Sequence, residues 1–317
     1  MSKVLVIGGA GFIGSYLCNR LTKSPFDEVH VLDNLSMGDG LQNLDSPDSV
    51  RLIVGDAADP TVVGTILQDV SPDTVFHLAA NSDIKLSSRK PSIELENTFG
   101  TSAALGVALG KAGKTLPRLV FSSTSAVYGD VPFEIQSSTP KAPESAYGWM
   151  KLASERLFES LHSAGLVAKL DIIRFPNVTG KGQTHGVVKD LVAKYLDEKN
   201  EWEILGDGSQ TKPYVHAADL VDAIYDLMEQ SSDAEGINEV NLSPSDQISV
   251  SRIVELIDVR GGLERKPVFG ISGQGWAGDV NRYSYSQTDV AKYNIVFPSS
   301  LEAISRSIHE EFVASGR

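Results

Sequence analysis

The sequence lacks most features that mark secreted, metal-binding, nucleic-acid-binding or membrane proteins. Cys18 is its single cysteine, so the chain can form no internal disulfide and offers no cysteine cluster for zinc. Acidic residues outnumber basic ones by 41 to 28, which disfavours nucleic acid or an anionic membrane as a partner. No apolar run approaches the roughly 20 residues that cross a bilayer, and no secretion signal opens the chain. We therefore expect a cytoplasmic protein that binds no metal, no nucleic acid and no membrane.

Short apolar segments alternate with longer helical segments through the first half of the chain. The apolar segments are rich in Val, Ile and Leu without strict alternation, as expected for parallel strands buried on both faces. They lie at 4–7, 29–32, 52–54, 75–78, 119–121 and 170–173. This order predicts an α/β fold with a Rossmann-type doubly wound parallel sheet over residues 1–176. The rhythm changes afterwards, and we expect residues 177–317 to form mainly a smaller mixed α/β lobe that binds substrate, with some segments returning to the Rossmann domain.

A glycine-rich turn, GGAGFIGS, follows the first apolar segment. Gly8, Gly11 and Gly14 permit a tight turn, a close approach of the backbone to a pyrophosphate, and packing of the next helix on the strand. The second apolar segment ends in Asp33, whose carboxylate can accept hydrogen bonds from the adenosine ribose and would repel a 2′-phosphate. No lysine or arginine lies between Asp33 and Gln42. The pattern predicts NAD, rather than NADP, as the cofactor.

Tyr147 and Lys151 lie four residues apart in a helical segment and therefore share one face of it. An ammonium group beside a phenol favours the phenolate and lowers its pKa, so the pair predicts an acid/base catalyst. The hydroxyl-bearing residues 122–125 end an apolar strand at the sheet edge where ligands bind in such folds. Tyr195 and Lys199 have the same spacing but no such strand before them, and we expect them on the surface of a helix.

Taken together, these motifs resemble the extended short-chain dehydrogenase/reductase family, and within it the UDP-galactose/UDP-glucose 4-epimerases. The matching stretches are GGAGFIGS, LDNLS, GDAAD, FHLAAN, NTFGT, FSSTSAVYGD, YGWMK, RFPNVTG and LGDGSQTKPYVHAADL. The resemblance implies an NAD-dependent epimerase or dehydratase with Thr124, Tyr147 and Lys151 as its catalytic residues. It also implies a homodimer formed through the helical segments 93–111 and 146–162.

The motifs and the resemblance imply two sets of binding residues. NAD contacts are expected at Gly8, Gly11, Phe12, Ile13, Gly14, Asp33, Asn34, Asp56, Ala57, Leu78, Ala79, Ala80, Asn97, Ser122, Tyr147 and Lys151. Contacts with the nucleotide sugar are expected at Asn81, Ser123, Thr124, Asn177, His185, Val187, Val188, Glu203, Leu205, Lys212, Trp276 and Asp279. Lys212 and Trp276 stand where many relatives carry arginine, so the nucleotide stays open, with a UDP-hexose or UDP-hexosamine favoured.

In the implied reaction, Tyr147 takes the proton of the sugar's 4-hydroxyl while NAD oxidises carbon 4, and reduction from the opposite face gives the 4-epimer. A nucleotide-sugar dehydratase uses the same ketone and eliminates water, usually with an Asp-Glu pair after the strand threonine. This chain has Ser125 and Ala126 there, which favours the epimerase. A dehydratase with another base and a non-catalytic NAD-binding or sugar-nucleotide-binding protein stay open. The candidates for such a base are Asp83, Lys85 and Tyr128.

Overall fold

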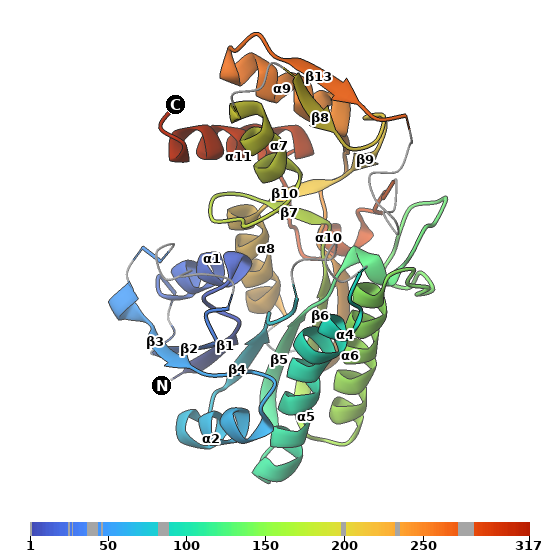
Figure 1. Cartoon of the computed structure of the whole chain (residues 1–317). Helices are drawn as coiled ribbons and strands as arrows, with labels where there is room; N and C mark the ends of the chain where they lie inside the picture. Colours follow the sequence, from blue (N-terminus) through green and yellow to red (C-terminus); the bar gives the residue numbers. More distant parts are fainter. Residues whose placement is uncertain are drawn as a thin grey trace.

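A seven-stranded sheet, parallel throughout, forms the centre of the molecule (Figure 1). The computed structural model describes residues 2–24, 26, 28–36, 44–45, 47–81, 89–197, 201–231, 235–271 and 282–317. The strands follow the order β11-β6-β5-β4-β1-β2-β3. They span Lys3–Ile7 (β1), Glu28–Asp33 (β2), Arg51–Val54 (β3), Thr74–His77 (β4), Leu116–Ser122 (β5), Val167–Arg174 (β6) and Gly236–Asn241 (β11). The predicted Rossmann-type doubly wound sheet is confirmed.

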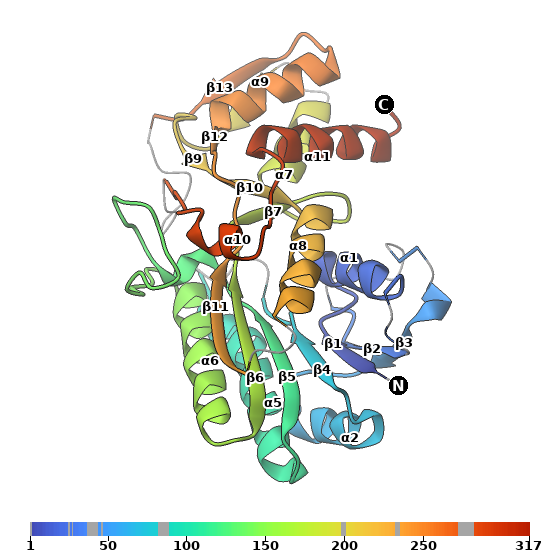
Figure 2. The same ribbon diagram turned by 180° about the vertical axis from the view of Figure 1, so that it is seen from behind.

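Helices cover both faces of this sheet, and the alternation of side chains along each strand feeds two cores. The helices span Phe12–Leu21 (α1), Pro60–Val70 (α2), Gly100–Ala112 (α5), Ala146–Ser163 (α6) and Ala217–Gln230 (α8). Val4 and Val6 of β1 pack in one core with residues of α1 and α8, while Leu5 and Ile7 pack in the other with residues of α2, α5 and α6. Figures 1 and 2 show α5 and α6 on one side of the sheet and α8 on the other.

A smaller lobe of helices and short strand pairs lies beyond the carboxyl ends of the central strands (Figures 1 and 2). A third core, which includes Trp202, Ile253 and Ile304, holds it together. Its helices are Val187–Leu196 (α7), Val250–Gly261 (α9) and Ser300–Ala314 (α11), and its strand pairs are Glu201–Ile204 (β8) with Lys266–Phe269 (β13), Asn177–Thr179 (β7) with Tyr214–His216 (β10), and Thr211–Lys212 (β9) with Ile248–Ser249 (β12). β11 comes from the same half of the chain but pairs with β6 in the central sheet. The division of the chain at residue 176 stays a prediction.

The predicted helix over 93–111 is interrupted. It begins as the short helix Ser92–Glu94 (α4), continues as one π-helical turn, Leu95–Phe99 (η3), and only then becomes the regular helix α5. The remaining short elements are Pro47–Ser49 (η2), Ser125–Val127 (η4) and Thr288–Lys292 (α10). Across the described residues, every helix is too short or too polar to cross a bilayer.

Two expectations about burial are wrong. The third strand, predicted to be covered on both faces, is the edge strand β3, and 64% of Val54 is exposed. Tyr195, expected on a helix surface, is fully buried in the smaller lobe, where its ring centroid lies 5.2 Å from that of Trp202. Its hydroxyl donates to the carbonyl of Leu263 at 3.0 Å and accepts from the amide of Leu263 at 2.8 Å. The tertiary contacts of the lobe therefore override the charged sequence around Tyr195.

Candidate active site

A cavity of about 430 Å³ lies at the carboxyl ends of β1, β2, β4 and β5. It brings together these residues predicted to bind NAD: Gly8, Gly11, Phe12, Ile13, Gly14, Asp33, Asn34, Asp56, Ala57, Leu78, Ala79, Ala80, Asn97 and Ser122. Asn81 and His185, predicted to bind substrate, also line it. The lining residues that the sequence analysis missed are Ala10, Leu32, Ser36, Thr101, Gly182 and Thr184. Four of these lie inside motifs already singled out, Ala10 in GGAGFIGS, Leu32 and Ser36 in LDNLS and Thr101 in NTFGT, so the motifs themselves contained the signal for them.

The glycine turn has the geometry of a phosphate cradle. Gly8 has a φ of 85°, and a Cβ built on it would lie 2.7 Å from the amide nitrogen of Ala79. Gly11 is the extended N-cap residue of α1, and no side chain caps that helix. Its first residues, Phe12 and Ile13, line the cavity, so amide groups and the positive end of the helix dipole are available to an anion. The turn therefore fits the pyrophosphate of a dinucleotide.

Asp33 is fixed at the end of β2 by its own neighbours. Its carboxylate accepts hydrogen bonds from the amide of Ala10 at 2.9 Å and from the amide of Leu35 at 2.8 Å. Of the described residues that line the cavity, none is a lysine or an arginine. A carboxylate without a cation nearby suits the free ribose hydroxyls of NAD and opposes the 2′-phosphate of NADP.

The predicted catalytic side chains converge where β5 ends and α6 begins. The Lys151 ammonium group is buried and donates to the carbonyl of Ser122 at 2.7 Å, and its nitrogen lies 6.0 Å from the ring centroid of Tyr147. The Thr124 side chain is hydrogen-bonded to Tyr147. A Cβ at Gly148 would lie 2.5 Å from the carbonyl oxygen of Ala126, so glycine allows this turn of α6 to approach the end of β5 closely.

The acid/base balance of this group differs from the expected one. Burial, and then the negative charge of Glu94, raise the pKa of Tyr147, and the hydrogen bond with Thr124 only partly opposes them. Burial lowers the pKa of Lys151 to about 8, against the opposing charges of Glu94 and Glu155. The expected lowering of the Tyr147 pKa is therefore wrong for the protein alone. In the absence of another positive charge, the structure favours the protonated phenol.

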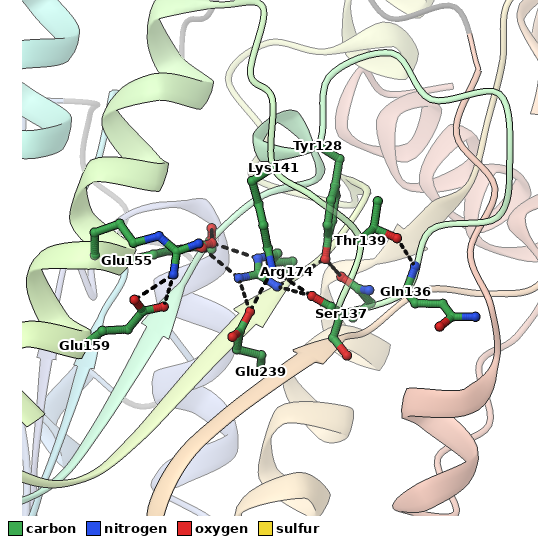
Figure 3. Close-up of polar contacts among 12 residues, drawn as sticks. Tyr128, Gln136, Ser137, Thr139, Lys141, Glu155, Glu159, Arg174 and Glu239 are labelled. Carbon is green, nitrogen blue, oxygen red and sulfur yellow. Dashed lines mark hydrogen bonds and ion pairs between the residues drawn. The ribbon is translucent and has the colours of Figure 1, made fainter. Parts of the chain in front are cut away.

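A buried ionic network joins α6, the helix that carries Tyr147 and Lys151, to the strands β6 and β11 (Figure 3). Arg174, at the end of β6, binds Glu155 of α6 through two hydrogen bonds of 2.7 and 2.8 Å and Glu239 of β11 through one of 2.6 Å. The Ser123 hydroxyl donates to Glu155, and Ser123 is 1% exposed. Because this hydroxyl is buried and already donates to Glu155, it is not available for the predicted contact with the sugar nucleotide.

Tyr128, one of the candidate bases for a dehydratase, belongs to the same network. Its hydroxyl donates to Asn241 at 2.8 Å and accepts from Arg174 at 3.1 Å. Burial raises the pKa of Tyr128 to about 12. A buried phenol held in this way is a poor base at neutral pH. The other two candidates, Asp83 and Lys85, lie outside the described residues.

The remaining predicted substrate residues come from the smaller lobe and are not among those lining the described cavity. They are Asn177 on β7, Val187 and Val188 on α7, Glu203 on β8, Leu205 just after β8, and Lys212 on β9. Val188 is 1% exposed and packs in the core of the lobe, so its side chain is not accessible to a sugar nucleotide. Trp276 and Asp279 lie outside the described residues.

Comparison with known proteins agrees with this geometry. The model of the NAD dependent epimerase/dehydratase family matches residues 4–243. The UDP-glucose 4-epimerase of Halalkalibacterium halodurans is 33% identical over 272 residues, which are 80% of this chain and 78% of that protein. The structure of the Thermotoga maritima UDP-glucose 4-epimerase with UDP-glucose has a TM-score of 0.87 and 26% identity, covering 99% of this chain and 100% of that one. The Thermus thermophilus UDP-glucose 4-epimerase in complex with NAD has a TM-score of 0.84 and 25% identity, covering 98% of this chain and 99% of that one.

These findings confirm the resemblance that the motifs indicated. The family match covers most of the chain and includes the glycine turn, the Asp33 strand and the segment with Tyr147 and Lys151. The cavity has the phosphate cradle and the ribose-binding carboxylate that fit the NAD on which this family depends. The chain therefore belongs to the NAD dependent epimerase/dehydratase family of enzymes.

Proposed function

We propose that this protein is an NAD-dependent nucleotide-sugar 4-epimerase that works through a transient 4-keto sugar, with a UDP-hexose or UDP-hexosamine as substrate. The observation that carries the proposal is the meeting of Thr124, Tyr147 and Lys151 beside Ser122, which lines the cavity. We propose that NAD contacts the predicted NAD-binding residues that line the cavity, together with Tyr147 and Lys151. The UDP-glucose 4-epimerases to which the chain is similar support the choice of reaction and of nucleotide.

The side chains divide the proton chemistry among them. When bound, NAD supplies reversible oxidation at carbon 4 of the sugar. Tyr147 accepts the proton of the 4-hydroxyl and returns it after the ketone has turned, and its partner Thr124 can relay that proton. Lys151 stabilises the phenolate by its charge, and the carbonyl of Ser122 holds its ammonium group in place. Because the substrate is oxidised and then reduced again, the cofactor is not consumed.

The surroundings of Ser125 favour epimerisation over elimination. The buried Ser125 hydroxyl donates to the carbonyl of Phe175 at 2.9 Å and accepts a hydrogen bond from the Tyr285 hydroxyl. The next residue, Ala126, has no side chain for proton transfer, and its amide donates to Thr124 at 3.2 Å. The two positions after the strand threonine therefore lack the acid and base that removal of the carbon-5 proton requires.

A panel of UDP-, dTDP-, GDP- and CDP-sugars followed by NMR tests the proposed function. We expect conversion of a UDP-hexose or UDP-hexosamine into its 4-epimer, with NAD released only when the protein is denatured. A 4-keto-6-deoxy or 5,6-unsaturated product would assign the enzyme to the dehydratases instead. Binding of a sugar nucleotide without conversion of any substrate would support the non-catalytic alternative.

We also propose that the protein is a cytoplasmic homodimer. Three apolar residues of η3, α5 and α6, the segments expected to form the dimer, are exposed: Leu95 by 57%, Val107 by 45% and Trp149 by 52%. A second copy of the chain would remove this apolar surface from water. A cytoplasmic location is supported by the single, buried and unpaired Cys18.

A further inference from the structure

A buried carboxylate that the sequence analysis did not single out lies beside the catalytic pair. Glu94 ends α4 and is 0% exposed. One of its oxygens accepts from the side-chain amide of Asn81 at 2.7 Å, and the other accepts from the hydroxyl of Thr98 at 2.5 Å. The hydroxyl oxygen of Thr98 in turn accepts from the backbone amide of Asn81 at 3.0 Å. The three residues form a closed ring of hydrogen bonds, and Asn81 lines the cavity.

The local backbone is shaped around this ring. Directly after Glu94 the chain makes the single π-helical turn Leu95–Phe99, a departure from the α-helix that occurs mostly at functional sites. This wider turn carries both Thr98, which binds Glu94, and Asn97, which lines the cavity. Glu94 therefore ties Asn81, in the segment that follows β4, to the helical turn that forms another part of the cavity wall.

The partners of Glu94 are neutral, which sets it apart from the other acid near the site. Glu155 is ion-paired with Arg174 in the network of Figure 3, so its charge is largely compensated. Glu94 is held by an amide and a hydroxyl, and burying an ionised carboxylate without a cation in contact is unfavourable. Its negative charge acts on Lys151, whose positive form it favours.

The charged and titratable groups that face the catalytic pair are few among the described residues. Tyr147 is affected by Glu94 and by the hydrogen bond of Thr124, and Lys151 by Glu94 and Glu155. His77, buried at the end of β4, has its pKa lowered to about 4 by burial and then by the charge of Lys151, so it is neutral. Among these described groups, Glu94 is therefore the one whose charge acts on both members of the pair.

We propose that Glu94 is a positioning residue that holds Asn81 at the cavity wall and supplies a buried negative charge behind the catalytic pair, which the positive charge of bound NAD would balance. The inference rests on the proposed function, in which Tyr147 is the acid/base group. Glu94 and Lys151 cancel each other while Tyr147 is a phenol. Once Tyr147 has released its proton to solvent and is a phenolate, its added negative charge would be balanced by the positive nicotinamide ring of bound NAD. The net charge of Glu94, Lys151, Tyr147 and NAD is then zero both before and after the sugar gives its proton to Tyr147 and its hydride to NAD. A neutral site is less costly to bury than a charged one.

The test is a pH titration of Tyr147 in the NAD-bound protein and in the protein freed of NAD. The tyrosinate absorbance of each protein is measured as the difference from its own Tyr147→Phe counterpart, so that the other tyrosines cancel. Glu94→Gln should shift the ionisation of Tyr147 to lower pH, because it removes the negative charge that disfavours the phenolate. The acid limb of the pH–rate profile should move in the same direction. Glu96→Gln, two residues along on an exposed position, is the matched control and should leave both curves unchanged.

A second variant, Glu94→Asp, and the activity of Glu94→Gln distinguish the role of Glu94 from the proposed epimerase activity. Glu94→Asp keeps the charge and should titrate like the unmodified protein, which also covers the case in which Glu94→Gln is too unstable to study. An unchanged Tyr147 titration in Glu94→Gln, or an equal shift in Glu96→Gln, would overturn the role of Glu94. A shifted titration in a protein that epimerises no sugar would leave the role of Glu94 intact and refute the proposed function alone.

Discussion

Replacing Arg174 with methionine should cost far more stability than replacing an exposed arginine on the neighbouring helix. Arg174 is 0% exposed and binds Glu155, Glu239 and the hydroxyl of Tyr128, so its loss leaves the fully buried carboxylate of Glu155 without a cation. Removing one partner of a buried ion pair typically destabilises a protein by about 3–5 kcal/mol, because an uncompensated charge stays buried. We expect Arg174→Met to lie in that range.

Arg156, one residue after Glu155, provides the matched control. It pairs with Glu159 at 2.7 Å but is 53% exposed in its side chain, and such surface pairs contribute about 0–1 kcal/mol. The assay is the free energy of unfolding from urea denaturation of Arg174→Met and Arg156→Met. The double variant Arg174→Met/Glu155→Leu should recover much of the lost stability, since it also removes the stranded charge. Equal losses in the two single variants would refute the account of the buried network.

Three other changes test the site and the assembly. Tyr147→Phe should lower turnover by about 10²–10⁴-fold while the fold and the NAD content are retained. Tyr195→Phe should leave turnover unchanged and lower the free energy of unfolding by only the roughly 1 kcal/mol of a buried hydrogen bond. The reverse pattern would show that the catalytic tyrosine is misassigned. Asp33→Ala should weaken NAD binding by about 1–3 kcal/mol in calorimetry, and equal affinity of the unmodified protein for NAD and NADP would contradict the role of Asp33. Light scattering should give twice the 34.0 kDa of one chain, with Trp149→Glu shifting the protein toward monomer, and a monomeric unmodified protein would exclude the dimer.

The parts of the site that follow strand ends could be predicted from the sequence. In a parallel sheet the carboxyl ends of the strands meet at one edge, so the motifs that follow β1, β2, β4 and β5 had to converge. This is why Gly8, Asp33, Ala79 and Ser122 line one cavity although they are far apart in the chain. Short-range rules of turn and helix formation were sufficient for these positions.

The residues that were missed or misplaced depend on side-chain direction and tertiary contact. Neighbouring residues at a strand end point to opposite sides, so Ser123 reaches Glu155 while Thr124 meets Tyr147. Local sequence does not distinguish Glu94 from Glu96, because tertiary packing leaves Glu94 buried at the end of α4 and Glu96 exposed in the π-helical turn. Tyr195 is buried by the lobe that folds around it, a contact that local periodicity does not encode.

The central claim, that the enzyme inverts carbon 4 without elimination, is tested most directly by running the reaction in deuterated water with the preferred sugar nucleotide. Simple epimerisation breaks no bond at carbon 5 or carbon 6, and Ser125 and Ala126 offer no base that could do so. The account predicts a product inverted at carbon 4 that carries no deuterium at carbon 5 or carbon 6. Loss of water from the product, or deuterium at either carbon, would contradict it and identify the enzyme as a dehydratase.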